Sequence, residues 1–179
     1  MPMNKTKVRK KFLLARKISL KRKKEASSKA LEILACITKK YSKVLSFAST
    51  KDELDLWPLN KQLLKDQKLL LPKVSGKTLK PYTIENLSDL KSPPKWKILE
   101  PTLQNSKPLN LKDVTIVLVP ALAFDQNGYR LGHGFGYYDR FLKEIPHAYT
   151  IGIGFKELLS LDDLPIEPHD IALKALLLF

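Results

Sequence analysis

The chain has 179 residues, of which 44% are hydrophobic and 28% are charged, and its formal net charge is +14. This length fits one domain with a sizeable core, which we expect to span residues 1–179. The single cysteine excludes an intramolecular disulfide and a cysteine-based zinc site, and its apolar helical surroundings predict a buried Cys36. No apolar run approaches the roughly 20 residues that cross a membrane, and no apolar segment follows the basic start as in a secretory signal. We therefore expect a cytoplasmic monomer that contacts no membrane.

The N-terminal 24 residues are strongly basic, with eleven lysines and arginines and no acidic residue. Such a segment can bind nucleic acid, form a cationic wall around a polyanionic substrate, or be an ordinary solvated helix. The chain has no RNP-like or zinc-finger pattern, and only Phe12 lies among these basic residues, so nucleic acid is a disfavoured partner.

The first part of the chain predicts two helices. Val8 and Phe12 are four residues apart, which places them on one face of a helix over 5–17. Ser19 is a typical N-cap residue and begins a second helix that we expect to end near Tyr41. The basic segment at 5–24 is therefore largely helical.

A strand–helix–strand unit follows. The apolar run at 44–49 predicts a short buried strand, and the leucine spacing over 52–66 predicts a helix with Pro58 near its first turn. A second strand at 69–71 is expected to end at Pro72. This order predicts a parallel βαβ unit.

The remainder of the chain alternates between irregular and regular segments. Residues 73–113 are rich in proline, so we expect loop over most of them, with a short strand or two near 82–84. The clear elements that follow are a strand at 114–119, a helix at 137–144 and strands at 149–155 and 171–179. The whole predicts a three-layer α/β/α domain with a mainly parallel sheet.

The most informative segment is VPALAFDQNGYRLGHGFGYYDRFL, at 119–142. It contains four of the seven glycines of the chain, and three of them alternate just before the predicted helix. Glycine allows close backbone approach to a ligand, and a helix N-terminus favours phosphate. Asn127 and Gly128 predict a tight turn. Arg130 and Asp139 add a cation and a metal-capable carboxylate, so the segment predicts a nucleotide site with Mg²⁺, although its spacing matches neither the Walker nor the dinucleotide pattern.

This segment resembles the signature of the 5-formyltetrahydrofolate cyclo-ligase family, which is close to PGLAFDxxGxRLGxGxGYYDxxL. The matching positions are Pro120, Leu122, Phe124, Asp125, Gly128, Arg130, Leu131, Gly132, Gly134, Gly136, Tyr137, Tyr138, Asp139 and Leu142. The resemblance extends to further positions along the chain: Lys5 with Arg9, Glu53, Pro72, Glu100 with Pro101, Pro165 and Asp170.

The resemblance implies a fold similar to the ribose-phosphate isomerase and CoA-transferase type. It also implies ATP- and Mg²⁺-dependent conversion of 5-formyltetrahydrofolate to 5,10-methenyltetrahydrofolate. The implied ATP contacts are Lys5, Arg9, Arg130, Leu131, Gly132, His133, Gly134, Phe135, Gly136, Tyr137 and Tyr138. The implied folate contacts are Arg9, Ala48, Glu53, His133, Gly134, Phe135, Gly136 and Tyr137. Arg130 and Tyr137 are the expected catalytic residues, and Asp139 and Asp170 are the expected metal ligands.

Alternatives remain open for several of these residues. Lys5 and Arg9 could be plain surface charge, Glu53 could cap the following helix, and Asp139 could simply complement a helix dipole. His133 and Phe135 occupy loop positions where the family commonly has other residues, so a non-catalytic folate- or nucleotide-binding homologue is the alternative function. The high positive charge would suit a polyglutamylated folate. We expect His147 and His169 to be surface residues.

Overall fold

The computed structural model describes residues 4–93 and 98–179, and a seven-stranded sheet forms its centre. From edge to edge its strands are β11 (Ala175–Leu178), β10 (Tyr149–Gly154), β7 (Ile116–Pro120), β1 (Val44–Leu45), β2 (Leu69–Ser75), β3 (Thr78–Thr83) and β6 (Lys107–Pro108). The first five run parallel, and β3 and β6 extend the sheet in antiparallel pairings. The predicted α/β domain with a mainly parallel sheet is confirmed.

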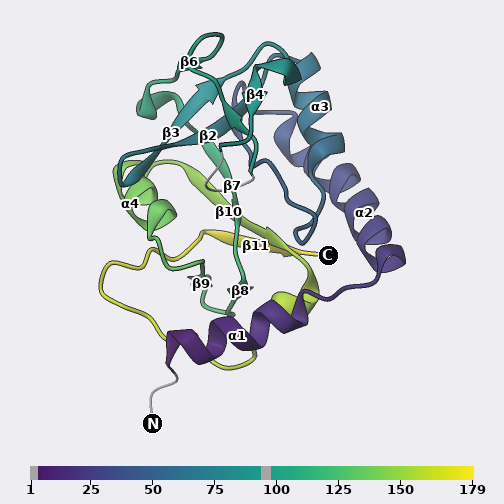
Figure 1. Ribbon diagram of the computed structural model, residues 1–179, viewed down its shortest axis with the longest axis vertical. Helices are drawn as coiled ribbons and strands as arrows, with labels where there is room; N and C mark the ends of the chain where they lie inside the picture. The colour runs from purple at the N-terminus through teal and green to yellow at the C-terminus, as the bar shows by residue number, and fades with distance from the viewer. Residues whose placement is uncertain (1–3, 94–97) are drawn as a thin grey trace.

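Helices cover both faces of this sheet and one of its ends. The helices are α1 (Lys5–Ala15), α2 (Leu20–Thr38), α3 (Trp57–Lys65) and α4 (Tyr137–Glu144). Helices α2 and α3 lie on one side of the sheet and α4 lies on the other (Figure 1). Each face has its own apolar cluster, with Leu34 and Leu59 in one and Val117 and Phe141 in the other. None of the helices in the described residues is long and apolar enough to cross a membrane.

The first two helices begin at capping residues, and the second begins after Ser19 as predicted. The Asn4 side chain accepts a hydrogen bond from the Thr6 amide at 2.8 Å, and the Ser19 hydroxyl accepts one from the Arg22 amide at 3.3 Å. Such caps satisfy amides that have no acceptor within the helix. Helix α2 ends at Thr38, three residues before the predicted end.

The prediction of a buried Cys36 is wrong, because this cysteine is exposed. The buried stripe of α2 runs through Ala26, Ala30, Leu34 and Thr38, at intervals of four residues. A residue two positions after Leu34 therefore faces away from the sheet.

Helix α3 begins at Trp57, five residues later than the prediction from leucine spacing. Pro58 occupies its first turn, where its missing amide is tolerated. The Asp55 carboxylate accepts from the Trp57 amide at 2.9 Å, and the Ser49 hydroxyl accepts from the Leu56 amide at 3.0 Å. Residues 52–56 are thus free to form the loop that carries Glu53.

The prediction that Pro72 ends the second strand is wrong. Strand β2 continues to Ser75 and forms a hairpin with β3, in which Pro72 lies opposite Pro81. On its other side β2 pairs with β1 only at Leu69 and Leu70, so Pro72 interrupts no hydrogen bond to β1. Residues 73–75, 78–83 and 107–108 of the expected loop region are therefore part of the sheet, which is more strand than the one or two short strands expected near 82–84.

Short elements complete the chain. Two additional antiparallel pairs join β4 (Leu90–Lys91) to β5 (Glu100–Pro101), and β8 (Ala123–Phe124) to β9 (Arg130–Leu131). The short 3-10 helices are η1 (Leu87–Asp89), η2 (Leu111–Asp113) and η3 (Lys156–Leu158). Gly128, at φ +83°, lies in the turn between β8 and β9, which confirms the tight turn predicted from Asn127 and Gly128.

Candidate active site at the carboxyl end of the sheet

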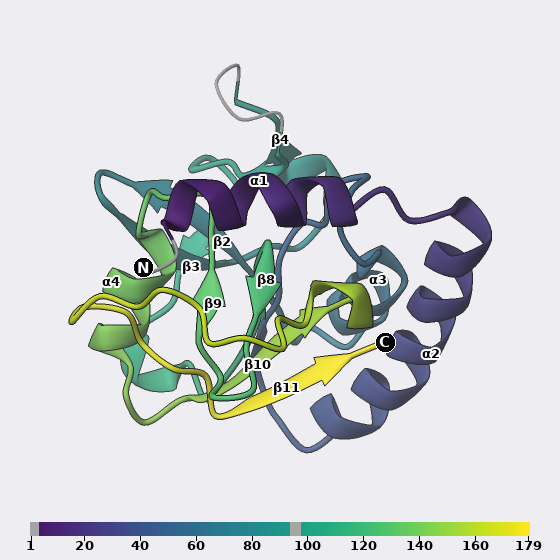
Figure 2. The ribbon, with the colours of Figure 1, turned by 90° about the horizontal axis from the view of Figure 1, so that it is seen from below.

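Helix α1 lies across the end of the molecule where β8 and β9 follow β7 (Figure 2). Ligands in open α/β sheets commonly bind beyond the carboxyl ends of the strands. Three basic residues of α1 or its C-cap, Lys5, Arg9 and Arg16, share a helical face with the buried Val8 and Phe12, because they are spaced by four and seven residues. Packing of the apolar residues therefore turns the three cations toward this end of the sheet.

The glycine loop (residues 132–136) connects β9 to α4 and is largely exposed. The Arg9 Nε donates to the Gly132 carbonyl at 3.0 Å. Gly134 has φ +99°, and a Cβ there would come within 3.4 Å of the Arg9 guanidinium. Gly136 is the N-cap of α4 at φ +64°. The loop thus needs glycine at these two positions, and it presents the amides of a helix start beside an arginine.

Arg130 is a buried cation with two partners. Its side chain is 4% exposed, and its guanidinium donates at 2.6 Å both to the Asp139 carboxylate and to the Ile171 carbonyl. The Ile171 amide donates to the same Asp139 oxygen at 3.2 Å. Burial lowers the pKa of Arg130, and the charge of Asp139 opposes that shift. Asp139 is therefore more than a complement to the helix dipole, because it joins α4 to β9 and to the segment before β11.

Lys5 forms a second charged contact at this end. Its ammonium lies 2.8 Å from Asp170 Oδ2 and 3.3 Å from the Glu167 carboxylate. The same Asp170 oxygen accepts from the Glu167 amide at 2.7 Å. Burial alone would raise the pKa of Asp170, but the bonds from Lys5 and the Glu167 amide outweigh it, and the pKa is lowered. Lys5 is thus held in an ion pair and is not plain surface charge.

The two carboxylates that the resemblance implies as metal ligands have different partners in the structure. Within the described residues, a group that brings metal-capable atoms within 4.8 Å of one another consists of Glu167, His169 and Asp170. Asp139 lies outside that group and contacts Arg130. His169 has a side chain that is 66% exposed, which confirms its place on the surface.

Glu53 lies in the loop after β1 and does not cap α3. One of its carboxylate oxygens accepts from the Thr50 amide at 2.8 Å and from the Thr50 hydroxyl at 3.0 Å. The other lies 3.6 Å from an Arg16 Nη2. A cavity of about 290 Å³ adjoins the carboxylate, lined by Lys23, Ser49, Thr50, Lys51, Glu53, Asp55 and Trp57. Glu53 is thus a fixed anion at the wall of a small open space.

The Tyr138 hydroxyl is influenced by the charges of both Glu53 and Arg130. Burial raises the pKa of its hydroxyl, the charge of Glu53 adds to the shift, and Arg130 opposes it. The phenol is therefore a neutral hydrogen-bond donor near neutral pH. The His133 imidazole has a lowered pKa because of partial burial and the nearby Arg16 and Arg9, with Glu53 acting in the opposite direction.

Aromatic and apolar positions play different parts. The rings of Phe135 and Tyr137 stack with centroids 5.8 Å apart, and the Arg140 guanidinium lies 5.7 Å from the Tyr137 ring centre. Leu131 is buried in the core at 2% exposure and Ala48 at 7%, so neither side chain is open to a ligand. These two could contribute backbone groups alone.

Sequence reasoning missed Arg16, Thr50 and Arg140. Arg16 could have been found from its spacing, because it lies seven residues after Arg9 on the face that carries Phe12. Thr50 lies three residues before Glu53, which is a common spacing for a side chain that bonds to a nearby backbone amide. Arg140 donates to the Phe135 carbonyl at 2.5 Å and also to the Lys77 carbonyl, and so ties the glycine loop to the β2–β3 hairpin. No sequence signal places Lys77 near Arg140.

Comparisons with known proteins agree on one family. A family model described as the 5-formyltetrahydrofolate cyclo-ligase family matches residues 2–178. The 5-formyltetrahydrofolate cyclo-ligase of Escherichia coli K12 is 36% identical over 141 residues, which cover 74% of this chain and 75% of that protein. A mouse protein with that name is 28% identical over 136 residues, covering 69% of this chain and 66% of its own.

Solved structures give the same result. The NMR structure of Aquifex aeolicus 5,10-methenyltetrahydrofolate synthetase matches with a TM-score of 0.84 and 34% identity, covering 97% of this chain and 89% of that one. A 5,10-methenyltetrahydrofolate synthetase from Mycoplasma pneumoniae matches with a TM-score of 0.75 at 23% identity, over 97% of this chain and 98% of that one, and so shares the fold.

Proposed function

The chain belongs to the 5-formyltetrahydrofolate cyclo-ligase family of enzymes, and we propose that it converts 5-formyltetrahydrofolate to 5,10-methenyltetrahydrofolate with ATP and Mg²⁺, releasing ADP and phosphate. The observation that best supports this proposal is the meeting of two kinds of group at one end of the sheet. Arg9 donates a hydrogen bond to the glycine loop, and the Glu53 carboxylate adjoins a cavity. The pKa of Tyr138 is affected by the charges of both Glu53 and Arg130.

The reaction needs an activated formyl group. A formyl group on nitrogen is a poor electrophile, and its oxygen leaves poorly. A phosphoryl group on that oxygen allows the neighbouring folate nitrogen to attack the formyl carbon and close the ring. The C–O bond then breaks, and phosphate leaves with the oxygen. Such phosphoryl transfer depends mainly on positioning and charge neutralisation, which this site can supply.

The phosphate side has suitable donors. Arg9 and the amides at the start of α4 lie around the glycine loop, and we propose that they bind the phosphates of ATP. The Arg130 guanidinium is held by Asp139 and Ile171, so it supplies a positive charge in a fixed position near the glycine loop. In catalysis we assign Arg130 to charge stabilisation, and Tyr137 to the wall of the site through its ring.

The acidic residues fit a divalent cation. The Lys5 ammonium lies 2.8 Å from Asp170, and a bound metal ion would take its place at this carboxylate. Carboxylate oxygens are the ligands that Mg²⁺ prefers, and we propose that Asp170 and Asp139 hold the ion directly or through water. Bound there, Mg²⁺ would neutralise phosphate charge during transfer.

The folate side centres on Glu53. A pterin ring is rich in N–H donors, and a carboxylate accepts up to four hydrogen bonds. Because Thr50 occupies one oxygen of Glu53, the other is the oxygen that we expect to accept from the ring. The charges of Glu53 and Arg130 both act on the neutral Tyr138 hydroxyl, and we propose that this hydroxyl donates a hydrogen bond to an oxygen of the bound ligands.

The direct test is the absorbance of the methenyl product, which lies at longer wavelength than that of the substrate. We expect purified protein with 5-formyltetrahydrofolate and Mg²⁺ to form product only after ATP is added, and Asp139→Asn to lower the rate by about a hundredfold. Binding of both ligands without turnover would instead support the alternative of a non-catalytic binding homologue. The observation that suggests this alternative is the bulky Phe135 in the glycine loop, which is 49% exposed.

Three finer properties are also proposed. We propose a cytoplasmic monomer, and a substrate whose glutamate tail carries additional anionic residues, because the net charge is +14. At low salt, polyglutamylated substrate should bind more tightly than the monoglutamate form. Equal affinity for the two forms would contradict the last of these properties.

A further inference from the structure

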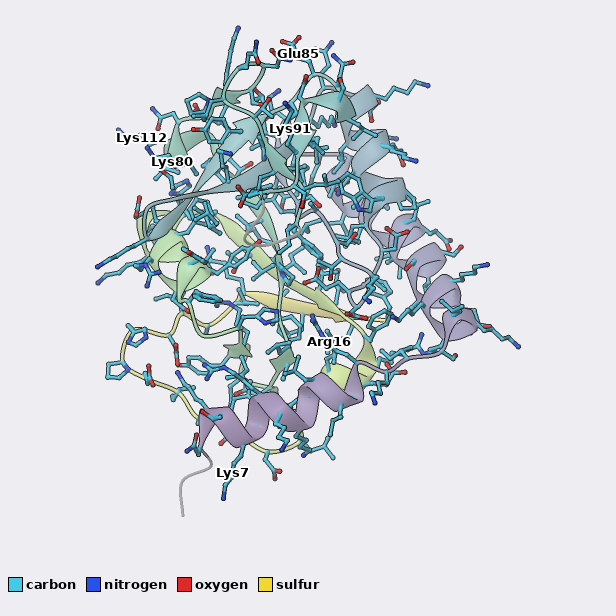
Figure 3. The ribbon with its side chains drawn as sticks, viewed as in Figure 1. Lys7, Arg16, Lys80, Glu85, Lys91 and Lys112 are labelled. Carbon is cyan, nitrogen blue, oxygen red and sulfur yellow. The ribbon has the colours of Figure 1, made fainter. Side chains whose placement is uncertain are left out.

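Arg16 is a buried cation that the steps above do not use. It is 8% exposed, and its Nη2 donates to the Ala121 carbonyl at 3.2 Å. Its side chain extends from the end of α1 toward the sheet, whereas Lys7 on the same helix points into solvent (Figure 3). An arginine stays protonated when buried, so its charge needs a partner nearby.

That partner is loosely matched. The Glu53 carboxylate lies 3.6 Å from Nη2, which is too long for a good hydrogen bond. The Arg16 Nε is buried and has no hydrogen-bond partner in the described part of the chain. A buried donor without a partner costs stability, so fold stability alone does not account for this arrangement.

Two groups lie against the Glu53 carboxylate. Thr50 holds one oxygen through two hydrogen bonds, and Arg16 faces the other. Arg16 is not among the residues that line the cavity beside Glu53. A ligand in the cavity would therefore meet a carboxylate that Thr50 already orients and that has a cation beside it.

We propose that Arg16 is a positioning residue for the folate, acting through Glu53. The inference rests on the proposed function, because it takes the N–H donors of the folate ring as the partners of Glu53. Arg16 holds the carboxylate in the direction that accepts from the ring, and offsets the loss of its hydration when the ring covers it. It is not assigned a contact with ATP.

A double-mutant cycle tests this role, with direct binding of 5-formyltetrahydrofolate in the absence of ATP as the readout. The variants are Arg16→Met, Glu53→Gln and the pair. We expect Arg16→Met to weaken folate binding by about tenfold in the wild-type background, and by less than about twofold when Glu53 is already Gln. A purely structural arginine would weaken binding equally in both backgrounds, which would overturn the proposal.

Arg22→Met is the matched control. Arg22 forms an ion pair with Glu157 at 3.0 Å and donates to the Phe179 carbonyl, and none of these three residues lines the cavity beside Glu53. Its removal should leave folate affinity within about twofold of wild type. Kinetics add a second readout, because Arg16→Met should raise KM for the folate and leave KM for ATP within about twofold.

Arg16→Lys covers the case in which the methionine variant does not fold. Lysine keeps the charge but lacks the planar fork, so we expect a loss of about threefold that again disappears in the Glu53→Gln background. Absence of any loss in Arg16→Lys and Arg16→Met would overturn the proposal. A wild-type protein that binds folate but forms no product with ATP would contradict the proposed function and leave this binding test intact.

Discussion

Two buried arginines at the carboxyl end of the sheet differ sharply in how they are held. Arg130 donates at 2.6 Å to both a carboxylate and a carbonyl, whereas Arg16 has one bond at 3.2 Å, a carboxylate at 3.6 Å and an unpartnered Nε. The first has two short hydrogen bonds within the protein and joins three segments of the chain. The second has a buried Nε without a partner and lies next to the Glu53 carboxylate. In the proposed function, the phosphate side would be prebuilt, whereas the folate side would be completed by its ligand.

The largest expected effect is at Arg130. Arg130→Met leaves Asp139 without its buried partner, so we expect the free energy of unfolding to fall by about 3–5 kcal/mol. Urea unfolding measures this, with Arg16→Met as the comparison. If Arg16→Met were the more destabilising of the two, the contrast between the arginines would be wrong.

The next effect is in the glycine loop. Gly134→Ala places a Cβ at φ +99° beside the Arg9 guanidinium, so we expect backbone strain of about 1–3 kcal/mol and a rise in KM for ATP of at least about tenfold. Gly132→Ala is the control, because a Cβ there meets nothing within 4 Å. Equal effects of both changes on KM would show that the geometry at 134 is not the cause.

The contact between Lys5 and Asp170 predicts a pH dependence of stability. The pKa of Asp170 is lowered from 3.8, so its ionised form adds stability above that value, and this contribution is lost as pH falls through the lower folded-state pKa. The difference in unfolding free energy between wild type and Asp170→Asn should therefore shrink below about pH 3.8. A difference that stays constant across the acid range would contradict the ion pair.

The smallest effect lies outside the site. Lys174 donates to the Pro146 carbonyl at 2.9 Å and the Ala148 carbonyl at 2.7 Å, after the end of α4. Lys174→Met should cost about 1 kcal/mol in unfolding free energy and leave both KM values unchanged. A changed KM for either substrate would show that the loop after α4 communicates with the site.

Much of the fold could be predicted because its elements carry local signals. Ser19 marks the start of α2, the β-branched run marks β7, and the spacing of Val8 and Phe12 marks the buried face of α1. The course of β2 through Pro72 could not be predicted, because the proline is tolerated only where β1 has ended, which is a tertiary fact. The exposure of Cys36 could not be predicted from its apolar neighbours alone, because the buried stripe of α2 follows a four-residue spacing that leaves Cys36 out.

The site was predicted unevenly for a similar reason. The glycine loop and Asp139 lie in one continuous segment, so a motif reveals them. Arg16 and Glu53 are 37 positions apart in the sequence and meet only because α1 crosses the end of the sheet. Residue pairs brought together by packing leave no local pattern in a single sequence.

The most direct test of the central claim measures phosphate release and methenyl product in the same reaction. If both substrates react at one end of the sheet in one coupled process, each product molecule should accompany one phosphate, and neither should form when the other substrate is left out. Phosphate released without folate, or product formed without ATP, would contradict the coupled cyclo-ligase reaction.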